Sequence, residues 1–185
     1  RNGSLQTYVA WLLAVVSLIR SRENSRLDDK GAMAPLTKQD VARWDAVRIE
    51  AGRSALDRAT ALRTPGPLQT LAAIHLTHAM RLHGRPTDWR AILRLYDALL
   101  EMRPTPVVAI NRAVALSRAH SPEDGLAALE ELDAKRLADF LPFHAACADM
   151  LARAGRRTEA LAAYDMALAL APERAEQRFL EGRRD

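Results

Sequence analysis

A helical stripe that ends at a proline recurs in this chain and constrains its fold more than any other feature. Ala160, Tyr164 and Ala167 lie at helical spacing, and Pro172 ends their helix because proline lacks an amide proton and clashes with the preceding turn. The same arrangement stands 68 residues earlier in "LYDALLEMRP" (95–104), which aligns with "AYDMALALAP" (163–172). Sixty-eight residues are two periods of 34, a length typical of helix–turn–helix repeats. The pattern therefore predicts stacked helical hairpins.

Helical periodicity extends along the whole sequence, and no alternating strand pattern interrupts it. Glycine and proline separate the periodic segments, as in "RTPGP" (63–67) and "SPEDG" (121–125). Residues 28–40 form the only long loop that we expect, so successive helices after it should be antiparallel neighbours. The predicted helices cover residues 5–22, 39–63, 67–83, 87–102, 105–119, 121–132, 137–154, 156–170 and 172–183.

The predicted fold class is all-α, a tetratricopeptide (TPR)-like array of stacked hairpins with a helical N-terminal part. We expect one compact domain, in which residues 9–83 form irregular hairpins and residues 84–185 form TPR-like repeats with a capping helix at 172–183. Residues 1–8 read as a tag or a divergent start. The middle repeat is degenerate, with Glu130 and Ala138 where the pattern has an aromatic residue and a proline. Phe179 and Leu180 would cover the last apolar face, leaving the Arg and Glu side chains of the cap in water.

Composition excludes several classes of protein. The net charge of +4 comes from 24 arginines and 3 lysines that are scattered among acidic residues, without a basic run and interleaved aromatics, so we expect no direct contact with nucleic acid. The most apolar segment, "YVAWLLAVVSLI" (8–19), is shorter than the roughly 20 residues that cross a bilayer, so we expect no membrane partner. A single cysteine, Cys147, excludes an internal disulfide and fits a cytoplasmic protein.

Catalytic and metal-binding patterns are weak. His75 and His78 lie three residues apart on one predicted helix, but no nearby carboxylate or cysteine completes a set of four ligands. Packing therefore explains these histidines better than a metal does. Cys147 stands at a helix-packing position and reads as a small hydrophobic residue rather than a nucleophile. The sequence contains neither a phosphate-binding glycine loop nor a nucleophile elbow, so we predict no enzyme activity, no metal and no cofactor.

Two polar residues lie inside an otherwise apolar helix, "PTPVVAINRAVAL" (104–116). In TPR registration Asn111 and Arg112 fall near the concave groove, where they could bind a peptide backbone, a carboxylate or a neighbouring loop. They could equally join helices within the stack, and the sequence leaves both interpretations open. Asp149 and Arg153 are the corresponding candidates in the last repeat.

Four segments together resemble a known family: "TKQDVARWD" (37–45), "TPGPLQTLAAIHLTHA" (64–79), "TDWRAILRLYDALLEMRPTPVVAINRAVAL" (87–116) and "PERAEQRFLEGR" (172–183). They resemble the C-terminal, TPR-containing extension of a subgroup of extracytoplasmic-function (ECF) sigma factors, over roughly residues 10–185. The third segment is the most specific.

The resemblance implies a regulatory, protein-interaction domain of a bacterial transcription initiation factor. It implies as partners sigma regions 2 and 4 of the same polypeptide, RNA polymerase or a regulatory protein. Neither promoter-reading region is present in this sequence. Asn111 and Arg112 match the family motif, and the resemblance assigns them to intramolecular or partner contacts. The alternative that stays open is a free-standing TPR-like adaptor that binds peptide tails.

Overall fold

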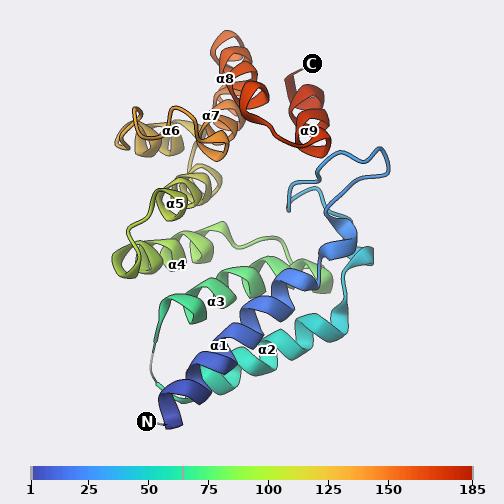
Figure 1. Ribbon diagram of the computed structural model, residues 1–185, viewed down its shortest axis with the longest axis vertical. Helices are drawn as coiled ribbons and strands as arrows, with labels where there is room; N and C mark the ends of the chain where they lie inside the picture. Colours follow the sequence, from blue (N-terminus) through green and yellow to red (C-terminus); the bar gives the residue numbers. More distant parts are fainter. Residues whose placement is uncertain (1, 64, 185) are drawn as a thin grey trace. The chain divides into compact units, whose positions relative to one another are not determined.

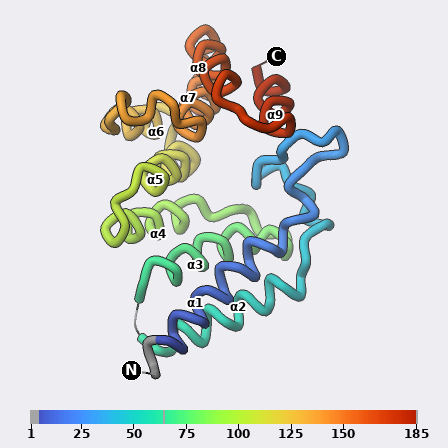
Figure 2. The backbone as a smooth tube through the Cα atoms, viewed as in Figure 1, coloured from blue at the N-terminus to red at the C-terminus, as the bar shows by residue number. Residues whose placement is uncertain are grey.

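The computed structural model describes residues 2–63 and 65–184, and these residues form nine α-helices, three short 3-10 helices and no β-strand (Figures 1 and 2). The predicted all-α class is confirmed. Arg1 in the predicted 1–8 start and Thr64 in the predicted 63–67 break lie outside the described residues. The α-helices are α1 (Asn2–Arg20), α2 (Ala46–Ala61), α3 (Pro67–Ala79), α4 (Trp89–Met102), α5 (Pro106–Ala119), α6 (Pro122–Glu130), α7 (Leu141–Arg153), α8 (Arg157–Leu170) and α9 (Arg174–Arg184). The 3-10 helices are η1 (Glu23–Ser25), η2 (Val41–Arg43) and η3 (Met80–His83).

Local chemistry sets most helix starts close to where the sequence predicts them. The side chains of Asp45, Asp88, Thr105 and Ser121 each accept a hydrogen bond from a backbone amide in the first turn of the helix that follows. Proline stands in the first turn of α3, α5, α6 and α7, where its missing amide proton costs nothing. These starts need no tertiary information.

Two predicted boundaries are wrong. The helix predicted at 39–63 is interrupted at Trp44, which is extended (φ −79°, ψ 141°) because its indole turns into the core and donates to Ser25 Oγ at 3.0 Å. Asp45 then caps α2. The helix predicted at 137–154 begins only at Leu141, so residues 131–140 form a second long connection. The Asp133 carboxylate organises that connection by accepting from the amide of Lys135 at 3.1 Å.

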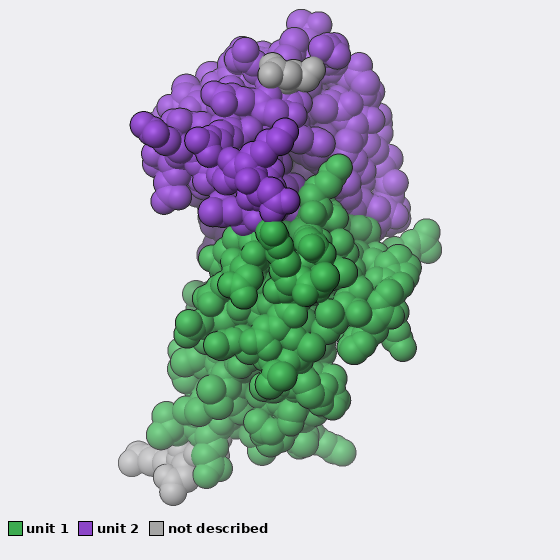
Figure 3. Space-filling view, turned by 90° about the vertical axis from the view of Figure 1, so that its right-hand side faces the viewer, with its two compact units in different colours: residues 1–26, 36–103 green, residues 27–35, 104–185 purple. Residues whose placement is uncertain are grey.

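The chain divides into two compact units where the sequence predicts one domain (Figure 3). Unit 1 comprises residues 1–26 and 36–103, and unit 2 comprises residues 27–35 and 104–185. The boundary falls after Arg103 rather than at residue 84, because α4 packs against α3 and completes a hairpin with it. Both units are discontinuous in sequence, because residues 27–35 belong to unit 2.

In unit 1, α1, α2 and α3 pack against one another, and α4 covers α3. α1 and α2 approach closely at Gly52, where an added Cβ would lie 2.6 Å from Leu18 Cγ. The Trp44 ring lies beside two arginines, with the guanidinium carbons of Arg22 and Arg81 at 5.9 and 5.4 Å from its centroid. The core of this unit consists of Ala14, Val15, Leu18, Trp44, Ile49, Ala55, Leu56, Ala72 and Ala79.

In unit 2, the hairpins α5–α6 and α7–α8 stack through a contact between α5 and α7, and α9 packs against α8. The predicted stripe is buried, with Ala160, Tyr164 and Ala167 each at most 3% exposed. α5 and α7 begin 35 residues apart, and so do α6 and α8. The 34-residue register therefore fails between these two hairpins by one residue. The residue that corresponds to the buried Tyr164 is Leu129, which is 2% exposed, and not Glu130.

Residues 27–35 join unit 2 as a compact loop. Asp28 Oδ1 accepts from the amides of Lys30 and Ala32, both at 2.9 Å, and Gly31 takes a left-handed φ of +73° that a residue with a Cβ rarely adopts. The amide of Met33 donates to the carbonyl of Ala175 at 3.0 Å, just inside α9. Arg178 Nη1 donates to the carbonyl of Lys30 at 2.9 Å. The loop is thereby fixed to α9.

Candidate functional site

Three helices of unit 2 bring arginines to a single carboxylate, Asp149 on α7. Arg118 of α5 donates from Nη2 to Asp149 Oδ2 at 2.9 Å, and Arg183 of α9 donates from Nη2 to Oδ1 at 2.6 Å. Arg153, one turn further along α7, places Nη1 3.8 Å from the same Oδ2. We call Arg118, Asp149, Arg153 and Arg183 the arginine cluster. It joins α5, α7 and α9 through one acidic residue.

Arg153 also binds α7 to α5 directly. Its Nη1 donates to Ser117 Oγ at 3.0 Å, and its Nη2 donates to the Ser117 carbonyl at 2.8 Å. Ser117 is 1% exposed, and its hydroxyl in turn donates to the carbonyl of Val114. A planar guanidinium suits this double contact because its donors form a rigid fork. Lysine could not reproduce the contact.

The cluster holds more positive than negative charge. Three guanidinium groups contact one carboxylate, and their side chains are between 26 and 35% exposed. Burial, followed by the neighbouring charge of Arg118, lowers the pKa of the Arg153 guanidinium, although arginine stays protonated at neutral pH. The charges of Asp149 and then Glu123 oppose that shift. A partly exposed surface with excess guanidinium charge favours carboxylates of a partner.

The structure brings two of the four predicted partner-binding residues together. Asp149 and Arg153 join helices within the stack, which is the second of the roles that the sequence leaves open for such residues. Asn111 is exposed on α5, seven residues before Arg118, and therefore lies about two turns away on the same helix face. Arg112 is half-buried on the same helix. For all four residues, contact with a partner stays a prediction.

Sequence reasoning missed Ser117, Arg118 and Arg183. The heptad spacing from Asn111 to Arg118 was a usable signal, because residues seven apart share a helix face. Arg183 gave no such signal, since the expectation for the capping helix was that its arginines face water. Its contact with Asp149 arises only when α9 packs back onto the stack.

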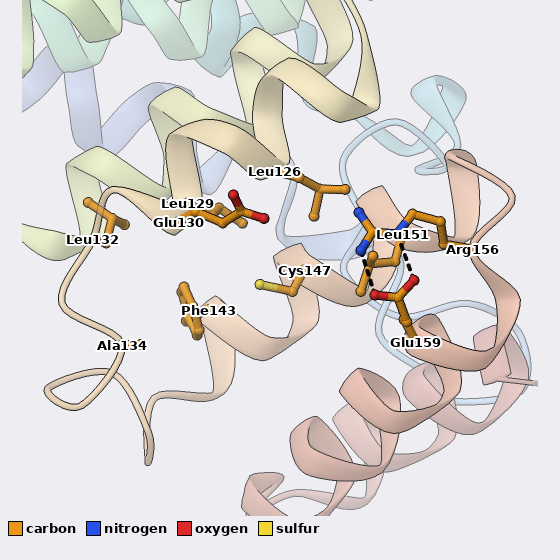
Figure 4. Close-up of a pocket in the computed structure, with 10 residues that line it drawn as sticks. All are labelled: Leu126, Leu129, Glu130, Leu132, Ala134, Phe143, Cys147, Leu151, Arg156 and Glu159. Carbon is orange, nitrogen blue, oxygen red and sulfur yellow. Dashed lines mark hydrogen bonds and ion pairs between the residues drawn. The ribbon is translucent and has the colours of Figure 1, made fainter.

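A second feature of unit 2 is an apolar pocket of about 370 Å³ between α6, the 131–140 connection, α7 and the start of α8 (Figure 4). At one end Arg156 Nε donates to Glu159 Oε1 at 2.7 Å. Burial raises the pKa of the Cys147 thiol to about 11, so this side chain is a neutral thiol at physiological pH, as a packing role requires. The lining residues are Leu126, Leu129, Glu130, Leu132, Ala134, Phe143, Cys147, Leu151, Arg156 and Glu159.

The predicted histidine pair has two separate packing partners in unit 1. His75 Nδ1 lies 3.0 Å from Arg22 Nη2 and accepts a hydrogen bond from it, because a guanidinium has only donors. The His78 ring packs edge-on against Trp89 with centroids 5.3 Å apart. Across residues 2–63 and 65–184, no three His, Cys, Asp or Glu side chains are grouped in a way that could hold a metal ion.

Within the described part of the chain, no helix combines the length and the apolar character needed to span a membrane.

These features define an all-α protein of helical hairpins whose unit 2 is joined by an arginine cluster. Residues 4–60, from α1 into α2, match a family of unknown function, DUF6596. The chain is also similar to a protein of Rhizobium meliloti (strain 1021) that is described as uncharacterized, with 38% identity over 169 residues. That match covers 91% of this chain and 40% of the relative, so the chain spans about two fifths of the relative's length. No solved structure matches.

Proposed function

We propose that this chain is the regulatory, protein-interaction domain of a bacterial ECF sigma factor involved in transcription initiation in the cytoplasm. The resemblance of residues 37–45, 64–79, 87–116 and 172–183 to the extension of such factors supports the proposal. The greater length of the Rhizobium meliloti relative is compatible with further regions in the same polypeptide. The domain itself carries out no chemistry in this proposal and acts by binding.

The arginine cluster carries the proposal for where binding occurs. Arg118 and Arg183 reach Asp149 from α5 and α9, and both are about one-third exposed. A carboxylate from sigma region 2 or 4, from RNA polymerase or from a regulatory protein can replace or share Asp149 as their partner. Asn111, two turns along the same face of α5, would contact the backbone of that partner. Binding changes transcription if the partner's active and inactive arrangements differ in affinity for this surface.

The test is promoter-specific transcription by the full-length protein, compared with the protein truncated just before this chain. Lost activity means that the domain holds the sigma regions productively on RNA polymerase, and increased activity means that it inhibits them until a partner binds. Unchanged activity contradicts the proposal.

Point variants locate the surface. Arg118→Gln and Asn111→Ala, each in the full-length protein, should change transcription in the same direction as truncation. Arg157→Gln is the matched control, because Arg157 is exposed on α8 of the same unit and takes no part in the cluster. Equal effects of Arg118→Gln and Arg157→Gln would remove the cluster from the mechanism.

The apolar pocket supports the alternative of a free-standing adaptor that binds peptide tails. Phe143, Cys147 and Leu151 offer a surface into which one apolar side chain of a peptide can insert (Figure 4). The reading frame upstream of this chain separates the two functions, since it either encodes sigma regions or does not.

A further inference from the structure

α1 exposes a continuous apolar stripe. Six large apolar side chains recur at spacings of three and four residues, which places them on one side of the helix. They are Leu5, Tyr8, Val9, Leu12, Leu13 and Val16, and their exposed fractions are 67, 51, 46, 44, 52 and 42%. We call these six residues the α1 stripe. A set of large apolar side chains gathered in this way marks an interaction surface, whereas scattered ones do not.

The opposite side of α1 is largely apolar as well, with Thr7 as its buried polar residue. Ala14, Val15 and Leu18 are at most 6% exposed and belong to the core of unit 1. From Leu5 to Arg20 the helix carries one charged residue, Arg20 itself, at its end. A helix that is apolar on all sides is normally buried on all sides.

The solvent-facing side of α2 in the same unit shows the contrast. There Arg53 contacts Glu50 at 2.5 Å and Asp57 at 2.7 Å, and all three side chains are at least 46% exposed. The exposed side chains of α2 are thus charged and paired, whereas those of the α1 stripe are apolar.

We propose that the α1 stripe is the docking surface for an amphipathic helix of the polypeptide that precedes residue 1 in the longer protein. The inference rests on the proposed function, under which the sigma regions precede this domain in the polypeptide. It adds a second contact surface, in unit 1, to the arginine cluster of unit 2. The stripe lies within residues 4–60, the segment that matches the DUF6596 family.

The size of the stripe favours a tethered partner over a second copy. Leu5 to Val16 spans about 16 Å of helix at 1.5 Å per residue. A stable dimer buries about 800 Å² and roughly 20–30 residues on each side, which six side chains do not reach. A segment linked to α1 has an effective concentration of about millimolar, so a small apolar contact is enough to hold it.

The chemistry of the stripe indicates what kind of surface it binds. Since the six side chains carry no charge, they offer nothing to an acidic peptide or to a nucleic-acid backbone and match the apolar face of another helix. The Rhizobium meliloti relative has the room for such a helix, because about three fifths of its length lies beyond the match.

Photo-crosslinking in the full-length protein tests this docking. A photoreactive amino acid at position 12 should link α1 to one segment that precedes it in the same chain. The same amino acid at position 166 is the control, because Met166 is also apolar and 49% exposed but lies on α8. It should give no link to that segment. A link between two copies, or no protein link from position 12, would overturn the proposal.

Hydrogen exchange gives a second, independent readout. Leu12→Gln should speed amide exchange at least tenfold in the docked segment while unit 1 keeps its own protection, because the side chain is already 44% exposed. Met166→Gln should leave exchange in that segment unchanged. Neither measurement depends on transcription, so a crosslink with unaltered transcription after truncation would contradict the proposed function and leave the docking intact.

Discussion

Close packing between helices limits the size of side chain that some positions of unit 2 can hold, and Gly125 of α6 is the clearest case. A Cβ at Gly125 would lie 2.8 Å from Met150 Sδ and 2.9 Å from the carbonyl of Ala113, and it would also meet the Cβ of Ser117. These atoms belong to α7 and α5, so three helices meet at this glycine. The sequence predicted the buried Ala160 and Tyr164 from their spacing. It could not distinguish Gly125 from an ordinary turn glycine in "SPEDG", because the contact depends on how three helices pack.

Gly125→Ala should therefore destabilise unit 2 by about 1–3 kcal/mol, the usual cost of overpacking. Gly182→Ala is the matched control, since Gly182 lies in α9 and a Cβ added there would meet no atom within 4 Å. That control should gain about 0.5–1 kcal/mol from helix propensity. The free energy of unfolding from urea titration measures both changes, and a stabilising Gly125→Ala would contradict the packing argument.

At the scale of elements, local capping made the helix starts predictable, whereas tertiary packing decided the boundaries that the sequence missed. α4 and α6, capped by Asp88 and Ser121, begin within two residues of the starts predicted at 87 and 121. Trp44 breaks a periodic segment because its indole is needed in the core, and periodicity carries no record of that. The register between the two hairpins of unit 2 changed by one residue for the same reason. The buried face fixes it, and Leu129 fits that face where Glu130 would not.

The capping helix α9 provides the prediction at this scale. The sequence predicts the same role for Phe179 and Leu180, but Leu180 is 2% exposed and Phe179 is only partly buried. Leu180→Ala should cost about 2–5 kcal/mol, and more than Phe179→Ala, because it empties a fully enclosed site. Met166→Ala, at a side chain that is 49% exposed, should cost much less. Urea unfolding of the three variants gives the order, and a larger loss for Phe179→Ala would contradict it.

At the scale of the whole molecule, the all-α class followed from periodicity alone, while the division into two units did not. Residues 27–35 look like an ordinary glycine- and proline-containing loop, yet they belong with α9 through bonds such as that of Arg178 to Lys30, 148 residues apart. Of the candidate site, the sequence found Asp149 and Arg153. The arginines from α5 and α9 could be placed beside them only by the three-dimensional packing.

The stability of the folded protein should depend on pH through two histidines. Burial, and next the charge of Arg22, lower the pKa of His75 to about 4 and that of His78 to about 3. Their unfolded pKa is about 6.5, so between these values the unfolded state binds more protons than the folded state. The contribution of these two histidines to the free energy of unfolding should be constant well above pH 6.5. Below it, stability should fall by about 1.4 kcal/mol per pH unit for each histidine, until the pH reaches the folded pKa.

Urea unfolding at pH 7, 5.5 and 4.5 measures that slope. His75→Gln should make it shallower, since the amide oxygen can still accept from Arg22 without titrating. His144→Gln is the control, because His144 lies on α7 outside this cluster, where its Nε2 contacts the carbonyl of Ala138. Equal slopes for wild type and His75→Gln would contradict the assignment.

The loop at 27–35 also has a consequence for the order of assembly. A ribosome makes these residues well before α9, so the loop has no docking site until α9 has also emerged. The contacts between Met33 and Ala175 and between Lys30 and Arg178 therefore have a very large sequence separation, of the kind that slows folding. Unit 2 is completed only once α9 has been synthesised, and in a nascent chain that stops before α9 the loop lacks its docking partner.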